Sequence, residues 1–181
     1  MLRQLALHSV LLILVLAIAA LAPLMAEDNL VETPIFRLEF PPGWKREGES
    51  TPLKVRGPNS EVLLMSIAMP APGDRNGSRL VGTKQMAQFW KETIRRALVG
   101  ATSQQGMKQT EPFAERVMQG LPLFTAKSQD DERGSFLSCY GLVGHGGAVF
   151  IITVEGWLKN KATAETAVEG MLKNIVWKRQ S

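Results

Sequence analysis

The side chains best suited to acid–base or nucleophilic chemistry gather around one histidine, His145, in the sequence GHGG. The only other histidine, His8, lies in the apolar N-terminal segment. A histidine supports nucleophilic catalysis when it contacts a serine or cysteine and is itself oriented by an acid. Ser138 precedes His145 by a few positions, and Asp130 could supply the acid if the fold brings the three together. One hypothesis is therefore a small-molecule hydrolase built on His145.

The residues around Ser138 favour a structural interpretation instead. Ser138 and Cys139 fall in the middle of an expected strand, in which Cys139 shares a face with Leu137 and Val143. A free cysteine on an apolar face behaves as a small buried hydrophobe. We therefore expect Cys139 to be buried, His145 to occupy an exposed turn, and neither to be a catalytic residue.

Metal and cofactor sites are not expected either. A zinc site needs three or four Cys, His or carboxylate ligands, and the chain outside its N-terminal segment has one histidine and one cysteine. The acidic run DDER at 130–133 lacks the alternating ligand spacing of a calcium loop, so we interpret it as a solvated hairpin tip. GHGG joins two expected strands rather than leading into a helix, so a hairpin turn explains it better than a phosphate cradle.

The charge distribution argues against nucleic acid as a partner. The formal net charge is +4, and the basic residues are scattered singly or in short pairs such as Arg95-Arg96. Nucleic-acid binding favours a clustered basic stripe with stacking aromatic residues, which this sequence lacks. The single cysteine also excludes an intramolecular disulfide, and no cysteine near residue 26 could accept a lipid.

The N-terminal segment has the pattern of a secretory signal peptide. Arg3 is its only charged residue before Glu27, and the run VLLILVLAIAALA at 10–22 is entirely apolar. We predict a signal peptide over residues 1–26, with cleavage between Ala26 and Glu27. The alternative is that residues 5–25 are retained as a membrane anchor, since their length is sufficient to cross a bilayer. In both cases the remaining chain is expected to be periplasmic or secreted.

The stretch FRLEFPPGW at 36–44 predicts a strand that ends abruptly. Its apolar residues alternate with charged ones, which indicates a half-buried strand over 36–40. Pro41 and Pro42 cannot donate ladder hydrogen bonds, so the strand must stop there. Gly43 permits a turn, and the large ring of Trp44 can fold back over the core.

Alternation and helical periodicity divide the rest of the chain into further elements. A helix is predicted over 83–99, with Thr83 as its N-cap and Gly100 as its stop. Its apolar stripe is formed by Met86, Phe89, Trp90, Ile94, Ala97 and Leu98. A second helix near the C-terminus carries an apolar stripe from Ala164 to Ile175. Strands are predicted over 53–57, 61–70, 108–117, 121–129, 134–143 and 148–156.

These elements predict an α+β fold in a single domain, residues 27–181. The short connections between the last four strands indicate successive antiparallel hairpins. Several strands are apolar on both faces, and each helix is apolar on one side only. We therefore expect a three-layer α/β/α sandwich, with a mainly antiparallel sheet of about six to seven strands and two main helices. Which helix covers which face stays open.

A strand of the type FRLEF followed by PPGW, hairpin strands, a central amphipathic helix, a meander and a C-terminal helix resembles the PsbP-like fold. The resemblance extends from Phe36 to Trp177, and Pro42, Gly43 and Trp44 carry its recognisable motif. The family includes PsbP of photosystem II, a Ran-binding nuclear import factor and the bacterial DcrB-type envelope proteins, to which this chain is closest in style. Many DcrB-type proteins are lipoproteins, whereas this chain lacks the lipid-accepting cysteine.

The resemblance implies a function in binding rather than in catalysis. Members of this family act largely by contacting other proteins, and the fold has no shared active site from which residues could be carried over. We therefore expect an exported, non-catalytic accessory module that binds another envelope protein. Of the four tryptophans, Trp44, Trp90 and Trp177 have core positions by pattern, and Trp157 is the candidate for an exposed contact.

Overall fold

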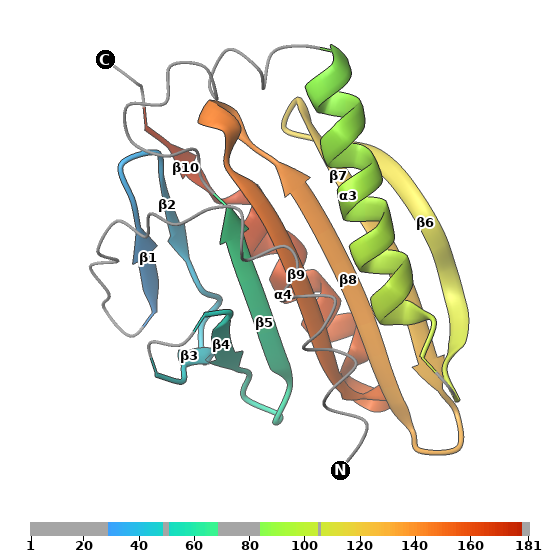
Figure 1. Cartoon of the computed structure of the whole chain (residues 1–181). Coiled ribbons are helices and arrows are strands. Elements are labelled where there is room, and N and C mark those ends of the chain that lie inside the picture. Colours follow the sequence, from blue (N-terminus) through green and yellow to red (C-terminus); the bar gives the residue numbers. More distant parts are fainter. Residues whose placement is uncertain (1–28, 49–50, 69–83, 105, 179–181) are drawn as a thin grey trace.

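The main sheet of the protein has seven strands. The computed structural model describes residues 29–48, 51–68, 84–104 and 106–178. Within these ranges all neighbouring strands of the main sheet run antiparallel (Figure 1). From one edge to the other the strands are β3 (Lys45–Arg46), β4 (Leu53–Arg56), β5 (Val62–Ala68), β9 (Val149–Trp157), β8 (Ser135–Val143), β7 (Leu121–Asp130) and β6 (Lys108–Met118).

Local turn chemistry sets the register of the long hairpin formed by β6 and β7. Met118 pairs with Leu121, so Gln119 and Gly120 form a two-residue loop. Both loop residues have positive φ, 52° and 78°, as the hairpin turns that match strand twist require. The predicted strand over 121–129 therefore starts where the sequence placed it. The other predicted limits agree with the structure or differ by one or two residues, except that residues 69–70 of the predicted strand 61–70 lie outside the described residues.

A second, smaller sheet was not predicted. It has three strands in the order β1 (Leu30–Glu32), β2 (Phe36–Glu39) and β10 (Val176–Trp177), and both pairings are antiparallel. The predicted strand over 36–40 therefore belongs to this sheet and not to the main one. Strands of two or three residues are too short to show a period, which is why β1 and β10 escaped the sequence analysis.

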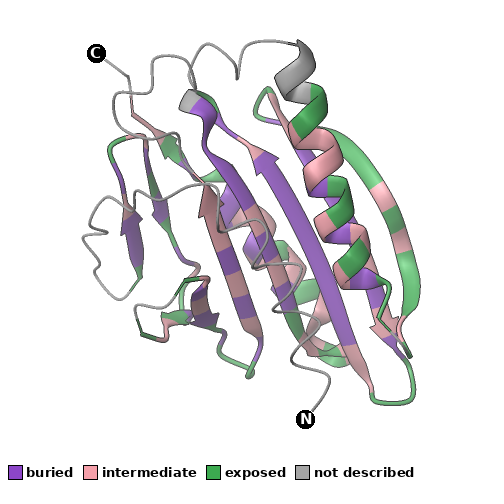
Figure 2. Ribbon diagram, viewed as in Figure 1, coloured by how far each residue is buried: buried purple, intermediate pink, exposed green. Residues whose placement is uncertain are grey.

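The two helices cover opposite faces of the main sheet, which confirms the α+β class and the three layers. Helix α3 (Lys84–Thr102) lies in front of β7 and β8 in Figure 1, and α4 (Lys161–Lys173) lies behind the sheet. One apolar cluster packs under α3, and a larger one joins α4, the small sheet and the rear face. Between them β8 is buried along nearly its whole length (Figure 2).

Helix α3 continues past the residue predicted to end it. Gly100 lies inside the helix, which ends at Thr102. The Thr102 hydroxyl donates a hydrogen bond to the Leu98 carbonyl at 2.9 Å, and Ala101 still packs against the sheet. Burial of this last turn outweighs the low helix propensity of one glycine. Thr83, the predicted N-cap, lies outside the described residues.

The large aromatic side chains divide between the core and the surface. Trp44 is buried as predicted, and Trp90 and Trp177 are half-buried against the two clusters. Trp157 is 55% exposed. Phe89 was placed on the apolar stripe of its helix, but it is 56% exposed and contacts only the edge of Trp90 among the aromatic rings described. The prediction was wrong at this position, because the buried face of the helix is narrower than the apolar stripe in the sequence.

Close packing of α3 depends on a glycine in β8. A Cβ added to Gly141 would lie 2.3 Å from Cγ2 of Ile94, a β-branched side chain with little rotamer freedom. We expect Gly141→Ala to lower the free energy of unfolding by about 1–3 kcal/mol, because the helix must move away from the sheet. Urea denaturation measures this loss. Gly100→Ala is the matched control, since its added Cβ meets nothing within 4 Å. Equal stability of Gly141→Ala and the natural chain would contradict the expected clash.

Candidate functional site

The structure does not bring together the residues of the hydrolase hypothesis. His145 lies in a short 3-10 turn, His145–Gly147, where it is exposed and its ring meets the edge of Trp177 at a centroid distance of 5.4 Å. Ser138 is buried in the middle of β8, about 20 Å away at the usual rise of a strand. Its hydroxyl donates to Oε1 of Glu165 at 2.5 Å. Asp130 ends the neighbouring strand β7 beside the start of β8, also remote from His145.

Cys139 is buried, as predicted. Its side chain lies in the cluster under α3, and burial raises the pKa of the thiol to about 12. Because the thiolate is the nucleophilic form, a thiol with this pKa is inert at neutral pH. The expectation that His145 occupies an exposed turn is also confirmed.

A polar cluster between α4 and the sheet was missed by the sequence analysis. Lys127 on β7 has a side chain only 14% exposed, and its Nζ lies 3.2 Å from Glu111 and 3.1 Å from Glu165. The Thr125 hydroxyl donates to Glu111, and the Ser138 hydroxyl donates to Glu165, both at 2.5 Å. The available signal was Lys127 itself, a charged residue inside the predicted strand over 121–129.

Lys127 and the neighbouring Tyr140 both stay protonated at neutral pH. Burial lowers the pKa of Lys127, but the hydrogen bonds and charges of Glu165 and Glu111 outweigh it and leave the pKa raised. Burial, together with the charges of Glu165 and Glu169, raises the pKa of Tyr140, whose buried hydroxyl has no hydrogen-bond partner in the described structure. Neither group can serve as a base at neutral pH. The cluster therefore ties α4 to strands β6–β8.

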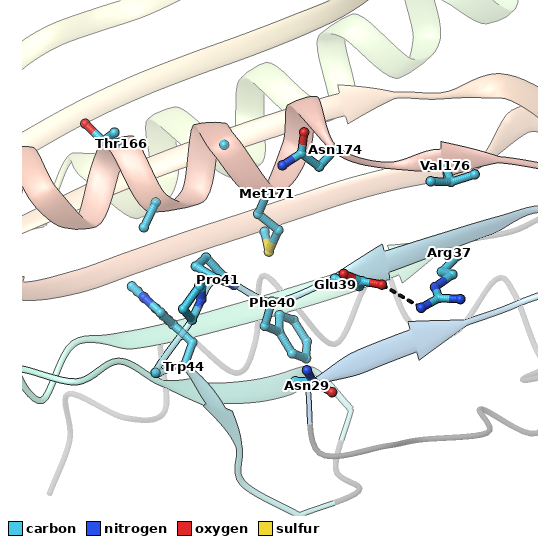
Figure 3. A pocket seen from close by; sticks show the side chains of 14 residues that line it. Asn29, Arg37, Glu39, Phe40, Pro41, Trp44, Thr166, Met171, Asn174 and Val176 are labelled. Atoms are coloured by element: carbon cyan, nitrogen blue, oxygen red, sulfur yellow. Dashed lines mark hydrogen bonds and ion pairs between the residues drawn. The ribbon is translucent and has the colours of Figure 1, made fainter.

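A groove lies between α4 and the small sheet, and we call it the α4 groove (Figure 3). Its volume is about 650 Å³. Phe40, Trp44 and Met171 form its apolar base, and all three are nearly fully buried. The complete lining is Asn29, Arg37, Glu39, Phe40, Pro41, Pro42, Gly43, Trp44, Thr166, Ala167, Gly170, Met171, Asn174 and Val176.

The PPGW motif forms one end of this groove. The backbone N–H of Trp44 donates to the Pro41 carbonyl at 3.0 Å, which closes the turn, and Gly43 adopts a φ of +82° that favours glycine. The backbone N–H of Phe40 donates to the carbonyl of Asn29 at 2.8 Å, so β1 begins beside the same turn. Residues singled out as a fold motif therefore also line the α4 groove.

The rim of the α4 groove is polar but carries no net charge. Arg37 Nη2 and Glu39 Oε1 lie 2.6 Å apart, so the two charged residues of the lining neutralise one another. The side-chain amides of Asn29 and Asn174 lie at the rim, and Val176 there is 59% exposed. The lining contains no histidine, cysteine or lysine. Its chemistry suits hydrogen bonding and apolar contact.

A second hollow of about 440 Å³ lies against the C-terminal end of the same helix. Asn174 lines both hollows, which places them on the two sides of this end of α4. Arg116 pairs with Glu169 at 2.6 Å across the second one, and Val117 is exposed there. Trp157 lines neither hollow, so its role as a surface contact stays a prediction.

Residues 29–48, 51–68, 84–104 and 106–178 contain neither a metal-binding group nor a helix that could cross a bilayer. Within those ranges no three His, Cys, Asp or Glu side chains come together as a metal-binding group. Neither described helix combines the length and the hydropathy that a bilayer crossing requires. Residues 1–28, with the predicted cleavage position Ala26–Glu27 and the anchor alternative over 5–25, lie outside the described residues.

Comparison with known proteins finds similarity at the level of structure. No family model matches the chain, and no curated protein matches it in sequence. Among solved structures, cyanobacterial PsbP (CyanoP) from Synechocystis sp. PCC 6803 is similar with a TM-score of 0.48 and 12% identity, over 88% of this chain and 99% of that one.

Two other structures are similar to the same degree. LpqN of Mycobacterium tuberculosis, involved in cell envelope biogenesis, has a TM-score of 0.49 and 12% identity over 80% of this chain and 83% of that one. PA94 of Pseudomonas aeruginosa, a protein of unknown function and putative regulator, has a TM-score of 0.42 and 15% identity over 84% and 97%. None of the three is described as a DcrB-type protein. Likeness at these values concerns the arrangement of elements alone.

Proposed function

We propose that this chain is an exported, non-catalytic module that binds another envelope protein through the α4 groove. The observation that carries the proposal is the lining of this groove, where an apolar base meets paired charges and two exposed amides. Such a surface recognises a partner by shape, hydrogen bonds and apolar contact. The residues of the hydrolase hypothesis, His145, Ser138 and Asp130, do not line this groove, and His145 lies apart from the other two.

The predicted cleavage between Ala26 and Glu27 is compatible with the described fold. Leu30 and Val31 in β1, the first strand of the described residues, are buried and lie after that position. Cleavage there would remove the apolar segment and leave the sheet intact. Mass spectrometry of the protein from the envelope fraction is expected to find Glu27 as the first residue. Retention of residues 5–25 would contradict cleavage and indicate a membrane anchor.

The binding surface is tested by crosslinking in living cells. A photo-crosslinking amino acid is placed at Thr166, which lines the α4 groove, or at Arg96, an exposed residue on α3 across the sheet. We expect the Thr166 variant to capture one envelope protein that the Arg96 variant does not capture. The captured protein must then bind the purified chain directly. The same proteins captured from both positions, or none from Thr166, would contradict the proposal.

A further inference from the structure

Gly170, on the wall of the α4 groove, is a glycine that the fold of the chain does not require. Gly170 lies inside α4, where glycine is less favourable than alanine. A Cβ added there would meet nothing within 4 Å. Gly141 and Gly144, by contrast, are pressed against Ile94 and Trp177, so packing requires both of them to be glycine. The folded chain alone therefore gains nothing from glycine at position 170.

Because Gly170 has no side chain, the backbone of α4 is uncovered at this point of the groove wall. Gly170 lies one position before Met171 of the apolar base, and the neighbouring wall residue Ala167 is also small. An occupant can therefore approach the helix backbone itself at this place. Close approach of a main chain is a common reason for glycine where local propensity disfavours it.

The polar groups at the rim match a peptide main chain. A side-chain amide offers donors and an acceptor together, so Asn29 and Asn174 can each bind the N–H and C=O groups of an extended segment. Arg37 and Glu39 neutralise one another, so the groove has no net charge with which to attract an ionic ligand. Complementarity of charge therefore favours an uncharged occupant.

The exposure of the rim residues also favours a peptide over a small molecule as the ligand of the groove. Many of the lining residues are exposed, including Arg37, Pro42, Thr166, Asn174 and Val176. A small-molecule site usually buries about 70–90% of its ligand, and an exposed rim does not enclose one. An extended segment can lie along it and continue into solvent at both ends.

We infer that the α4 groove binds an extended, uncharged peptide segment of the partner, with its main chain against Gly170 and an apolar side chain directed to Phe40 and Met171. This inference rests on the proposed function and specifies the ligand of the same surface. Gly170 acts as the residue that keeps the groove wide enough for a main chain.

The test is a selection of random dodecapeptides displayed on phage, with the protein produced as the full chain and purified from the envelope fraction. Enriched peptides are synthesised, and their Kd is measured by fluorescence anisotropy against the natural chain and three variants. Gly170→Leu fills the groove, Gly170→Ala narrows it slightly, and Ala162→Leu is the control at an exposed α4 position that lines neither hollow. Thermal unfolding checks that each variant is folded.

We expect uncharged peptides with apolar residues, bound at least about tenfold more weakly by Gly170→Leu and with unchanged affinity by Ala162→Leu. The melting temperature of Gly170→Leu should not fall, because leucine is a better helix former than glycine. Enrichment of strongly charged peptides, or equal binding to Gly170→Leu and the natural chain, would overturn the inference. If no peptide is enriched while Thr166 still captures a partner, the inference fails and the proposed function stands. If no peptide is enriched and Thr166 captures no partner, both the inference and the proposed function fail.

Discussion

Phe36→Ala is expected to lower the free energy of unfolding by about 3–5 kcal/mol, the largest effect of any single substitution considered for this protein. Phe36 is fully buried on β2. Its ring meets Phe150 of the main sheet at a centroid distance of 4.9 Å and Trp177 of β10 at 6.0 Å, both edge-to-face. Removing the ring leaves a cavity between the small sheet, which includes β10, and the main sheet. Urea denaturation followed by tryptophan fluorescence measures the loss.

Phe89→Ala is the matched control, because this phenylalanine is largely exposed. Its substitution is expected to change the free energy of unfolding by no more than about 0.5 kcal/mol. A loss for Phe36→Ala as small as that of the control would mean that the small sheet does not stabilise the rest of the fold.

Lys127→Met is expected to cost about 3 kcal/mol, because it leaves two carboxylates facing one another without their shared cation. Glu111 and Glu165 come from β6 and α4, and Lys127 lies between them with little exposure to solvent. Methionine fills a similar volume, so the loss reports the charges rather than a cavity. Denaturation in urea at neutral pH is again the measurement.

Two variants separate the buried cluster from surface ion pairs. Lys91→Met removes the cation of an exposed pair with Glu115 and is expected to cost less than about 1 kcal/mol. Adding Glu165→Gln to Lys127→Met should restore part of the lost stability, since one of the two facing charges is then removed. A double variant less stable than Lys127→Met would contradict the electrostatic explanation.

The same cluster predicts a dependence on pH. Burial raises the pKa of Glu111, but the hydrogen bonds from Thr125 and Lys127 outweigh it and the pKa is lowered. A lowered carboxyl pKa contributes stability above the ordinary carboxyl range, and that contribution is lost as the pH falls through the folded-state value. The difference in stability between the natural chain and Lys127→Met should therefore narrow as the pH falls from 7 towards about 3. A constant difference across this range would exclude the mechanism.

The sequence by itself determined the elements whose apolar pattern is local. Strand-like segments separated by turn residues marked β5 to β9, and short turns such as Gln119–Gly120 indicated that neighbouring strands are antiparallel. Helical periodicity located α3 and α4, and the position of Cys139 among apolar residues predicted its burial. These features depend mainly on residues close in the chain, so a local pattern is enough to locate them.

Only the tertiary structure decided how distant segments meet. The pairing of β2 with β10 joins Phe36 to Trp177, which no periodicity in either segment specifies. A stripe of apolar residues shows that a helix is covered but not by which face of the sheet. The same is true of Lys127, whose two carboxylates come from β6 and α4, and of the α4 groove, which the turn Pro41–Trp44 forms together with a helix from the other end of the chain. Such contacts depend on the packing of the whole molecule, because their free energy is gained only once the intervening chain has folded.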